Sequence, residues 1–157
     1  MKETDKRINI LLADDDDDDR AFFKECLTSI NTPTQLISVK NGDRLMDYLA
    51  NGLLPDIIFL DINMPRKSGL DCLREIRAES RYNHIPILMF STSSHLKDID
   101  EAFSMGANLY IPKSEFFKDE AQAVASIFSV EWKKKLLTRD KNKFVLQGKI
   151  VYEWTKG

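Results

Sequence analysis

Short runs of apolar residues alternate along the chain with longer stretches in which apolar residues recur every three or four positions. The short runs, whose continuous apolar character is typical of strands buried on both faces, are Ile8–Ala13, Leu36–Val39, Asp56–Leu60, Pro86–Phe90 and Leu109–Ile111. The longer stretches, whose spacing is typical of amphipathic helices, are Asp18–Ile30, Asp43–Ala50, Leu70–Glu79, Lys97–Met105 and Phe117–Leu137. Five strands that alternate with five helices predict right-handed crossovers and a parallel sheet with helices on both faces.

The residues after the fifth helical stretch follow a different pattern. Two short apolar segments, Phe144–Leu146 and Ile150–Trp154, flank a turn that contains glycine. This arrangement is consistent with a short hairpin, and equally with a tail that docks through Phe144 and Trp154.

Aromatic residues are numerous in the helical stretches. Phe22 and Phe23 are both expected in the core of the domain. The aromatic residues in and directly before the last stretch exceed what one helix can bury against a sheet, and they are Phe116, Phe117, Phe128 and Trp132. Some of these side chains are therefore available for a partner or for a docked tail.

Composition and charge narrow the class of protein. The chain has 157 residues, of which 43% are hydrophobic, and this length corresponds to one domain. Its net charge of −2 argues against a general nucleic-acid binder. No apolar run approaches the roughly 20 residues of a membrane span, and the first residues lack the apolar core of a signal peptide. We expect a cytoplasmic protein without a nucleic-acid or membrane partner, with a domain over residues 6–137, a tail or hairpin over residues 138–157 and no output domain.

The residues that come directly after the strands carry the candidate chemistry, because ligands of an open parallel sheet bind outside the carboxyl ends of its strands. Residues at these positions are Asp14, Asp15, Asp61, Ser91, Thr92 and Lys113. Carboxylates, hydroxyl groups and an ammonium together indicate a site for a hard divalent cation beside a phosphoryl group. Mg²⁺ is the cation that carboxylates typically hold together with phosphate oxygens.

Six consecutive aspartates, Asp14–Asp19, follow the first strand. Acid at the end of a buried strand needs a partner, so we assign Asp14 and Asp15 to the site. Acid in the first turn of a helix interacts favourably with the helix dipole, and we assign Asp17–Asp19 that structural role.

Four sequence motifs contain the candidate residues. They are the acidic pair Asp14-Asp15 after ILLA, LDINMPRKSG at Leu60–Gly69, MFST at Met89–Thr92 and YIPK at Tyr110–Lys113. Successive separations along Asp15, Asp61, Ser91 and Lys113 are 46, 30 and 22 residues. Together and in this order, the motifs resemble the receiver domain of bacterial two-component response regulators, from about Ile8 to Leu137. The resemblance implies a flavodoxin-like, doubly wound sheet of strand order 2-1-3-4-5.

The resemblance also implies a phosphoacceptor, Asp61, which receives its phosphoryl group from a histidine kinase or a histidine phosphotransfer protein. It implies Mg²⁺ bound directly by Asp15, Asp61 and the backbone carbonyl of Asn63, and through water by Asp14. The metal would remove the repulsion between these carboxylates and an incoming phosphoryl dianion. Such a protein is a switch, and not an enzyme beyond its own phosphorylation and dephosphorylation.

Further residues take their roles from the same resemblance. Lys113 would pair with one phosphoryl oxygen, and Ser91 would hydrogen-bond to another. Tyr110 occupies the position of the family's aromatic switch, whose rotamer follows Ser91. Asn63 and Ser93 occupy positions whose side chains tune the rate of dephosphorylation.

Ser114 departs from the family pattern, in which a proline follows the lysine, often across a cis peptide bond. Here Pro112 precedes Lys113 instead. Proline lacks an N–H group and is tolerated in edge strands, so we expect the fifth strand to lie at the edge of the sheet. Because the backbone after Lys113 differs from the family pattern, the departure affects how far the Lys113 side chain can reach toward the carboxylates.

Other functions remain open at this point. The order of Asp14, Ser91 and Lys113 also resembles the haloacid-dehalogenase phosphatases. In that case Asp14 would be the nucleophile and Asp16 the acid–base, although the sequence lacks the acidic pair that this family carries after a later strand. A receiver could also act as a shuttle that passes phosphate onward to a histidine phosphotransfer protein.

Partners follow from the switch interpretation. We expect output through contact with another protein, with a homodimer on phosphorylation as one form of it. The extended C-terminal tail resembles that of stand-alone receivers paired with phytochrome-type histidine kinases.

Overall fold

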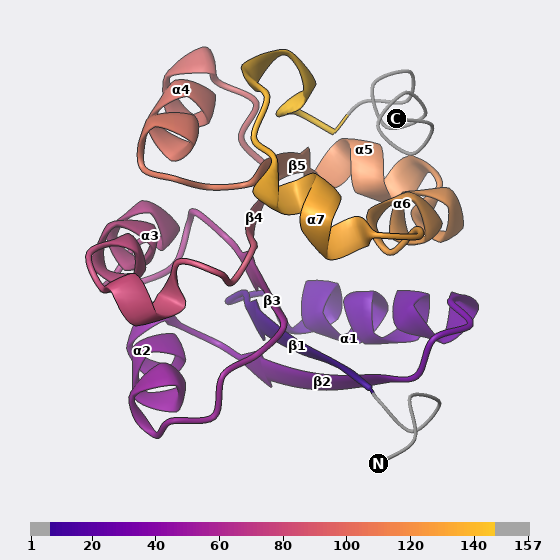
Figure 1. Ribbon diagram of the computed structural model, residues 1–157, viewed down its shortest axis with the longest axis horizontal. Helices are drawn as coiled ribbons and strands as arrows, with labels where there is room; N and C mark the ends of the chain where they lie inside the picture. Colours follow the sequence, from indigo (N-terminus) through magenta and orange to yellow (C-terminus); the bar gives the residue numbers. More distant parts are fainter. Residues whose placement is uncertain (1–6, 147–157) are drawn as a thin grey trace.

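The computed structural model describes residues 7–146, and a five-stranded parallel sheet forms its centre (Figure 1). The strands are β1 (Ile8–Ala13), β2 (Thr34–Val39), β3 (Ile57–Leu60), β4 (Ile87–Ser91) and β5 (Leu109–Pro112). Their order across the sheet is β2-β1-β3-β4-β5, and neighbouring strands run parallel. The fold class and the strand order expected from the sequence are therefore confirmed.

Helices cover both faces of this sheet (Figure 1). One face carries α1 (Asp17–Cys26), α5 (Lys113–Lys118), α6 (Glu120–Ile127) and α7 (Trp132–Leu137). The other face carries α2 (Gly42–Ala50), α3 (Gly69–Arg77) and α4 (Leu96–Ser104). Short 3₁₀ turns occupy Leu27–Ser29, Ser80–Tyr82 and Lys141–Lys143. Within the described part of the chain, no helix has the length and apolar character needed to cross a membrane.

The sheet separates two apolar cores. Ile57 and Phe59 of β3 point into the core that includes α1, whereas the residues that alternate with them point into the opposite core. Phe23 of α1 packs on Phe59 and Phe90, with ring centroids 4.8 and 5.8 Å apart. All four residues of β3 are fully buried, which explains why the central strands are continuously apolar.

Side-chain caps fix where the helices next to the strand ends begin. At the start of α1, the backbone N–H of Asp19 donates to Oδ1 of Asp16 over 2.9 Å. At the start of α3, the backbone N–H of Asp71 donates to Oγ of Ser68 over 3.2 Å. Caps of this kind stabilise a protein by about 1 kcal/mol. Because α1 and α3 follow the loops after β1 and β3, the caps also hold those loops in place.

The stretch Phe117–Leu137, expected as one helix, is divided among α5, α6 and α7. Asp119 ends α5 with a φ of −153°, and its side chain accepts a hydrogen bond from Gln122 N–H at the start of α6. Aspartate favours such local hydrogen bonds over the helix interior. Glu131, with a φ of 59°, precedes α7 in the left-handed region. The single-helix prediction was wrong because all three helices pack on one core and so share one apolar pattern.

The division into three helices also accounts for the aromatic residues of this stretch. Phe116 is fully buried, and the half-buried Phe117, Phe128 and Trp132 pack against the same core. Three short helices separated by breaks at Asp119 and Glu131 can bring more aromatic side chains to the sheet than one straight helix can.

Residues 144–146 lie alongside β5 and pair with it. The Tyr110 N–H donates to the Phe144 carbonyl, and the Leu146 N–H donates to the Tyr110 carbonyl, both over 2.8 Å. These bonds form a parallel bridge that lies outside the five named strands. As expected, β5 is the edge strand of the five-stranded sheet, and this later segment of the chain covers part of its outer edge.

The side chains of Phe144 and of Arg139, which precedes this segment, also contact α4. Phe144 is buried, and its ring centroid lies 5.0 Å from that of Phe103 in α4. Arg139 donates from Nε to the Ala107 carbonyl over 2.8 Å, and its guanidinium carbon lies 4.1 Å from the Phe103 ring centroid. Trp154 and the second half of the expected hairpin lie outside the described residues.

Candidate functional site

The carboxyl ends of four strands bring four of the expected site residues to one edge of the sheet. Asp14 follows β1, Asp61 follows β3, Ser91 ends β4 and Lys113 follows β5. All four are buried, with exposed fractions of at most 4%. The Asp61 N–H donates to the Ala13 carbonyl over 2.9 Å, which aligns the ends of β1 and β3. Buried charges need partners, and here the charged residues provide them for each other.

Asp14, Asp15 and Asp61 form a cluster of carboxylates. One carboxylate oxygen from each lies within 4.8 Å of the others, and Asp15 is the exposed member. Burial raises the pKa of Asp61 to about 7, since the lowering effect of the Lys113 charge is partly offset by the charge of Asp14. Closely placed carboxylates with excess negative charge are the oxygen donors that a hard divalent cation requires. The donor set therefore fits Mg²⁺.

The ammonium group of Lys113 lies among three carboxylates. Its Nζ is 2.8 Å from Oδ2 of both Asp14 and Asp19. It is 3.3 Å from Oδ2 of Asp61. Burial lowers the pKa of Lys113, but the contacts with Asp14 and Asp19 outweigh burial and leave that pKa raised, so the side chain stays charged. Lys113 reaches the carboxylates with Ser114 after it, and the bond between these two residues is trans.

Asp19 is the residue of this site that sequence reasoning missed. It lies in the first turn of α1, as expected of an acid that stabilises the helix. Its carboxylate also accepts a hydrogen bond from Lys113, which is 94 residues away in the chain. The cap at Asp16 fixes Asp19 in the helical turn directly after the acidic loop, but no local pattern in the sequence encodes its contact with Lys113.

Ser91, Ser93 and Tyr110 form a hydrogen-bonded chain that leads away from the carboxylates. The Ser93 N–H donates to Oγ of Ser91 over 3.1 Å, and the Tyr110 hydroxyl donates to the Ser93 carbonyl over 2.8 Å. The Ser93 hydroxyl donates to Oδ2 of Asp98 in α4 over 2.6 Å. Burial raises the pKa of Tyr110, so its hydroxyl keeps the proton that it donates. The chain thus connects the end of β4 with both β5 and α4.

The loop after β3 is held by a close approach between α3 and the backbone of Asp61. The Gly69 N–H donates to the Ile62 carbonyl over 2.8 Å. A Cβ atom on residue 69 would lie 2.0 Å from the Asp61 carbonyl oxygen, so only glycine fits there. Asn63 is exposed, and its N–H donates to Oδ1 of Asp61 over 3.2 Å. Thr92 is exposed as well.

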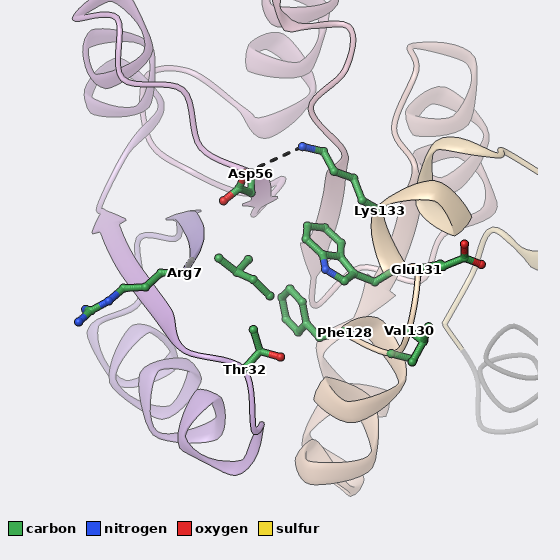
Figure 2. A pocket seen from close by; sticks show the side chains of 10 residues that line it. Arg7, Thr32, Asp56, Phe128, Val130, Glu131 and Lys133 are labelled. Carbon is green, nitrogen blue, oxygen red and sulfur yellow. Dashed lines mark ion pairs between the residues drawn. The ribbon is translucent and has the colours of Figure 1, made fainter. Parts of the chain in front are cut away.

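A pocket lies at the opposite, amino-terminal end of the strands (Figure 2). It has a volume of about 480 Å³, and its lining includes Ile8 at the start of β1, Asp56 before β3 and residues 128–133. Oδ2 of Asp56 accepts a hydrogen bond from Asn9 N–H over 2.8 Å, and its Oδ1 lies 3.9 Å from Nζ of Lys133. The ion pair joins α7 to the segment before β3, the hydrogen bond joins that segment to β1, and none of the expected site residues lines this pocket.

Similarity to known proteins agrees with this geometry. A family model of the response regulator receiver domain matches residues 10–125. The chain belongs to this family. Response regulator Rcp1 of Synechocystis sp. is 30% identical to this receiver domain over 126 residues, which cover 76% of the chain and 86% of Rcp1.

Two solved structures resemble this receiver domain over most of its length. The phosphorylated cyanobacterial phytochrome response regulator RcpA is 28% identical with a TM-score of 0.70, and the match covers 78% of this chain and 94% of RcpA. The Mn(2+)-bound form of response regulator Rcp1 is 29% identical with a TM-score of 0.70, and it covers the same shares of the two chains.

Membership of the family establishes a receiver domain of two-component signalling, which is a class of signalling switches. It decides against the haloacid-dehalogenase interpretation, in which Asp14 is the nucleophile and Asp16 moves protons. The exposed carboxylate of Asp16 instead caps α1 through its hydrogen bond with the Asp19 N–H.

Proposed function

We propose that Asp61 of this receiver domain accepts a phosphoryl group from a histidine kinase or a histidine phosphotransfer protein, in a reaction that requires Mg²⁺. The observation that carries the proposal is the position of Asp61. Its buried carboxylate lies at the end of the central strand β3, within the carboxylate cluster and 3.3 Å from the Lys113 ammonium.

The proposed transfer forms one bond and breaks one. An oxygen of Asp61 attacks phosphorus while the P–N bond of the phosphohistidine breaks. The electron pair of that bond goes to the histidine nitrogen, and the ring leaves as neutral imidazole because its other nitrogen already carries a proton in the phosphohistidine. Burial raises the pKa of Asp61, but the charge of Lys113 acts in the opposite direction and favours the nucleophilic carboxylate. The Lys113 ammonium and the Ser91 hydroxyl then hold phosphoryl oxygens in place.

Asp14, Asp15 and Asp61 would hold the Mg²⁺ ion, with Asp14 acting through water and the backbone carbonyl of Asn63 as a further ligand. When bound, the ion would neutralise charge that otherwise repels a phosphoryl dianion. The three carboxylates within 4.8 Å of one another support this assignment. The Mn(2+)-bound form of the relative Rcp1 supports a divalent cation in this receiver domain as well.

The hydrogen-bonded chain from Ser91 to α4 favours a switch over a phosphate shuttle. A Ser91 hydroxyl that turns to a phosphoryl oxygen gives up the hydrogen bond that it accepts from the Ser93 N–H. The Ser93 carbonyl holds the Tyr110 hydroxyl, so this change reaches β5 and α4 directly. A shuttle needs no such connection. We therefore propose output through protein contacts on this side of the domain, homodimer formation included, with Asn63 and Ser93 tuning dephosphorylation.

A phytochrome-type histidine kinase is the partner that we propose for this receiver domain in the cytoplasm. RcpA is named a cyanobacterial phytochrome response regulator, and its structure aligns with 78% of this chain. In sequence, response regulator Rcp1 is 30% identical to this receiver domain.

A trapping experiment tests the phosphoacceptor. The protein is incubated with Mg²⁺ and acetyl phosphate, reduced with borohydride and analysed by mass spectrometry, and Asp61 alone should be converted to homoserine. Asp61→Asn should abolish the reaction, and Asp15→Asn should suppress it because a metal ligand is lost. The exposed Asp18 offers a matched control, and Asp18→Asn should react like the wild type. Homoserine at Asp14, or unchanged labelling of Asp61→Asn, would contradict the proposal.

A further inference from the structure

Asp19 contacts the lysine of the site from outside the carboxylate cluster. Its Oδ2 lies 2.8 Å from Nζ of Lys113, which is as close as Oδ2 of Asp14 and closer than Oδ2 of Asp61 at 3.3 Å. The Asp19 side chain is 24% exposed, whereas those of Asp14 and Asp61 are at most 5% exposed. Asp19 therefore holds the ammonium from the solvent side.

The first turn of α1 is built to keep Asp19 in this position. The backbone N–H of Asp19 donates to the Asp16 cap over 2.9 Å. Next to it, Arg20 donates from its guanidinium to the Asp14 carbonyl over 2.6 Å and also pairs with Asp17. The turn is thus tied both to its own cap and to the backbone of the site loop, which fixes Asp19 relative to the strand end.

The three carboxylate partners of Lys113 have different fates in phosphoryl transfer. Asp14 and Asp61 belong to the cluster whose oxygens lie close enough to share a metal ion, and among the described residues Asp19 is not a member of it. Asp61 additionally takes the phosphoryl group in the proposed function. Asp19 is then the partner that stays available to Lys113 throughout. Lysine carries its charge on a flexible four-carbon stem, so its position depends on such a partner.

We propose that Asp19 is a positioning residue for phosphoryl transfer, whose carboxylate holds the Lys113 ammonium beside Asp61 before and during the reaction. This inference rests on the proposed function, because it assigns Asp19 a part in phosphorylation of Asp61. Asp19 acts through Lys113 and does not touch the phosphoryl group.

A simpler role for Asp19 makes a different prediction. Acid in the first turn stabilises a helix through its dipole, and Asp17, Asp18 and Asp19 share this property. If Asp19 did only that, removing its charge would have the same effect as removing the charge of Asp18. Asp18 is exposed and is not among the three carboxylates that contact Nζ of Lys113.

The matched variants are therefore Asp19→Asn and Asp18→Asn, each of which removes one negative charge from the same helical turn. The initial rate of Asp61 phosphorylation is measured at fixed Mg²⁺ over a range of acetyl phosphate concentrations. We expect Asp19→Asn to lower the maximal rate about tenfold, because misplacing a group that acts on the reacting atoms has effects up to about a hundredfold. Asp18→Asn should stay within about twofold of the wild type, and Asp19→Glu, which restores the charge, should recover most of the loss.

A double-mutant cycle with Lys113→Ala tests whether Asp19 acts through the lysine. In the Lys113→Ala background, Asp19→Asn should change the rate by less than about twofold, because the group that it positions is gone. A slowing that persists without Lys113, or an equal slowing by Asp18→Asn, would overturn the inference. Failure of the wild type to be labelled on Asp61 is a separate outcome, and it would contradict the proposed function itself.

A measurement without metal or phosphate provides a second test on the folded protein. The ¹H–¹⁵N signal of the Lys113 ammonium in ¹⁵N-lysine-labelled protein reports how firmly Nζ is held. We expect faster hydrogen exchange of this group in Asp19→Asn and wild-type exchange in Asp18→Asn. Exchange that is equal in the two variants would also overturn the inference.

Discussion

Asp61 has a folded-state pKa of about 7, well above its usual value of 3.8, because its carboxylate is buried and lies close to Asp14, which together outweigh the charge of Lys113. A raised pKa means that the folded protein binds this proton more tightly than the unfolded chain does. Asp61 therefore stabilises the fold fully only below about pH 4. That contribution is lost as the pH rises from about 4 to about 7.

We predict that Asp61→Asn raises the free energy of unfolding by an amount that grows with pH, because asparagine never ionises. Each pKa unit corresponds to about 1.4 kcal/mol, so the gain over wild type should increase by about 3 kcal/mol between pH 5 and pH 8. Urea unfolding of both proteins without metal measures it, with Asp18→Asn as a control that should show no such increase. A gain that is the same at every pH would contradict the raised pKa.

Single residues differ in how far the sequence could predict them. Asp14, Asp61 and Lys113 follow apolar runs, and a parallel sheet must bring such residues to one edge. The contact between Asp19 and Lys113 depends on how α1 sits on the sheet, and no local pattern encodes that. Phe22 was wrongly expected in the core, since it is 39% exposed and lies edge-on to Phe117 with ring centroids 5.1 Å apart. The neighbouring Phe23 occupies the core position instead.

At the scale of elements, the contact between the start of α3 and the loop after β3 determines where that loop lies. Gly69 is the first residue of α3, and its N–H bonds to the Ile62 carbonyl. Since the atom closest to a Cβ at this position would be the backbone oxygen of Asp61, no side-chain movement can make room. The helix and the loop must therefore separate if residue 69 is enlarged.

We predict that Gly69→Ala lowers the free energy of unfolding by about 3 kcal/mol, as overpacking does, and slows phosphorylation of Asp61 because the loop is displaced. Gly52→Ala is the matched control. Gly52 has a φ of +88° but open space around its Cα, so alanine there should destabilise by only about 1 kcal/mol. Its phosphorylation rate should match the wild type. Equal phosphorylation rates of the two variants would show that α3 does not position the loop.

Elements could be predicted well where side-chain caps and apolar periodicity agree, as in α1 and α3. The breaks at Asp119 and Glu131 could not, because the apolar pattern continues through them. A single aspartate inside an amphipathic stretch is compatible with a continuous helix and with a cap. Only the packing of α6 and α7 on the sheet decides between the two.

At the scale of the whole molecule, the segment after α7 packs on the rest of the domain. Residues 138–157 were expected to form a short hairpin or a tail that docks through Phe144 and Trp154, and Phe144 and Leu146 are buried in the two cores of the domain. The alternation of strands and helices could predict the sheet, since every crossover repeats the same pattern. A single bridge between Tyr110 and Val145 has no periodicity, so the sequence held no comparable signal for it.

We predict that Phe144→Ala lowers the free energy of unfolding by about 3 kcal/mol, because a buried ring packed on Phe103 is lost. Val145→Ala is the control, since Val145 is half-buried and pairs with Tyr110 through its backbone neighbours, and it should lower stability by less than about 1 kcal/mol. Urea unfolding measures both. The Tyr110 amide should also exchange hydrogen faster in Phe144→Ala, and equal stability of the two variants would contradict the importance of this docking.

The pairing of residues 144–146 with β5 also bears on solubility. An open strand edge displays N–H and C=O groups to which the strand of another molecule can add, and proteins avoid aggregation by covering such edges. Tyr110 gives both of these groups to Phe144 and Leu146 of its own chain. A protein that lost this cover would present an apolar strand as a template for pairing between molecules. The segment therefore prevents the strand of another molecule from pairing with the backbone of β5 at Tyr110, and it leaves side-chain contacts on this side of the domain open.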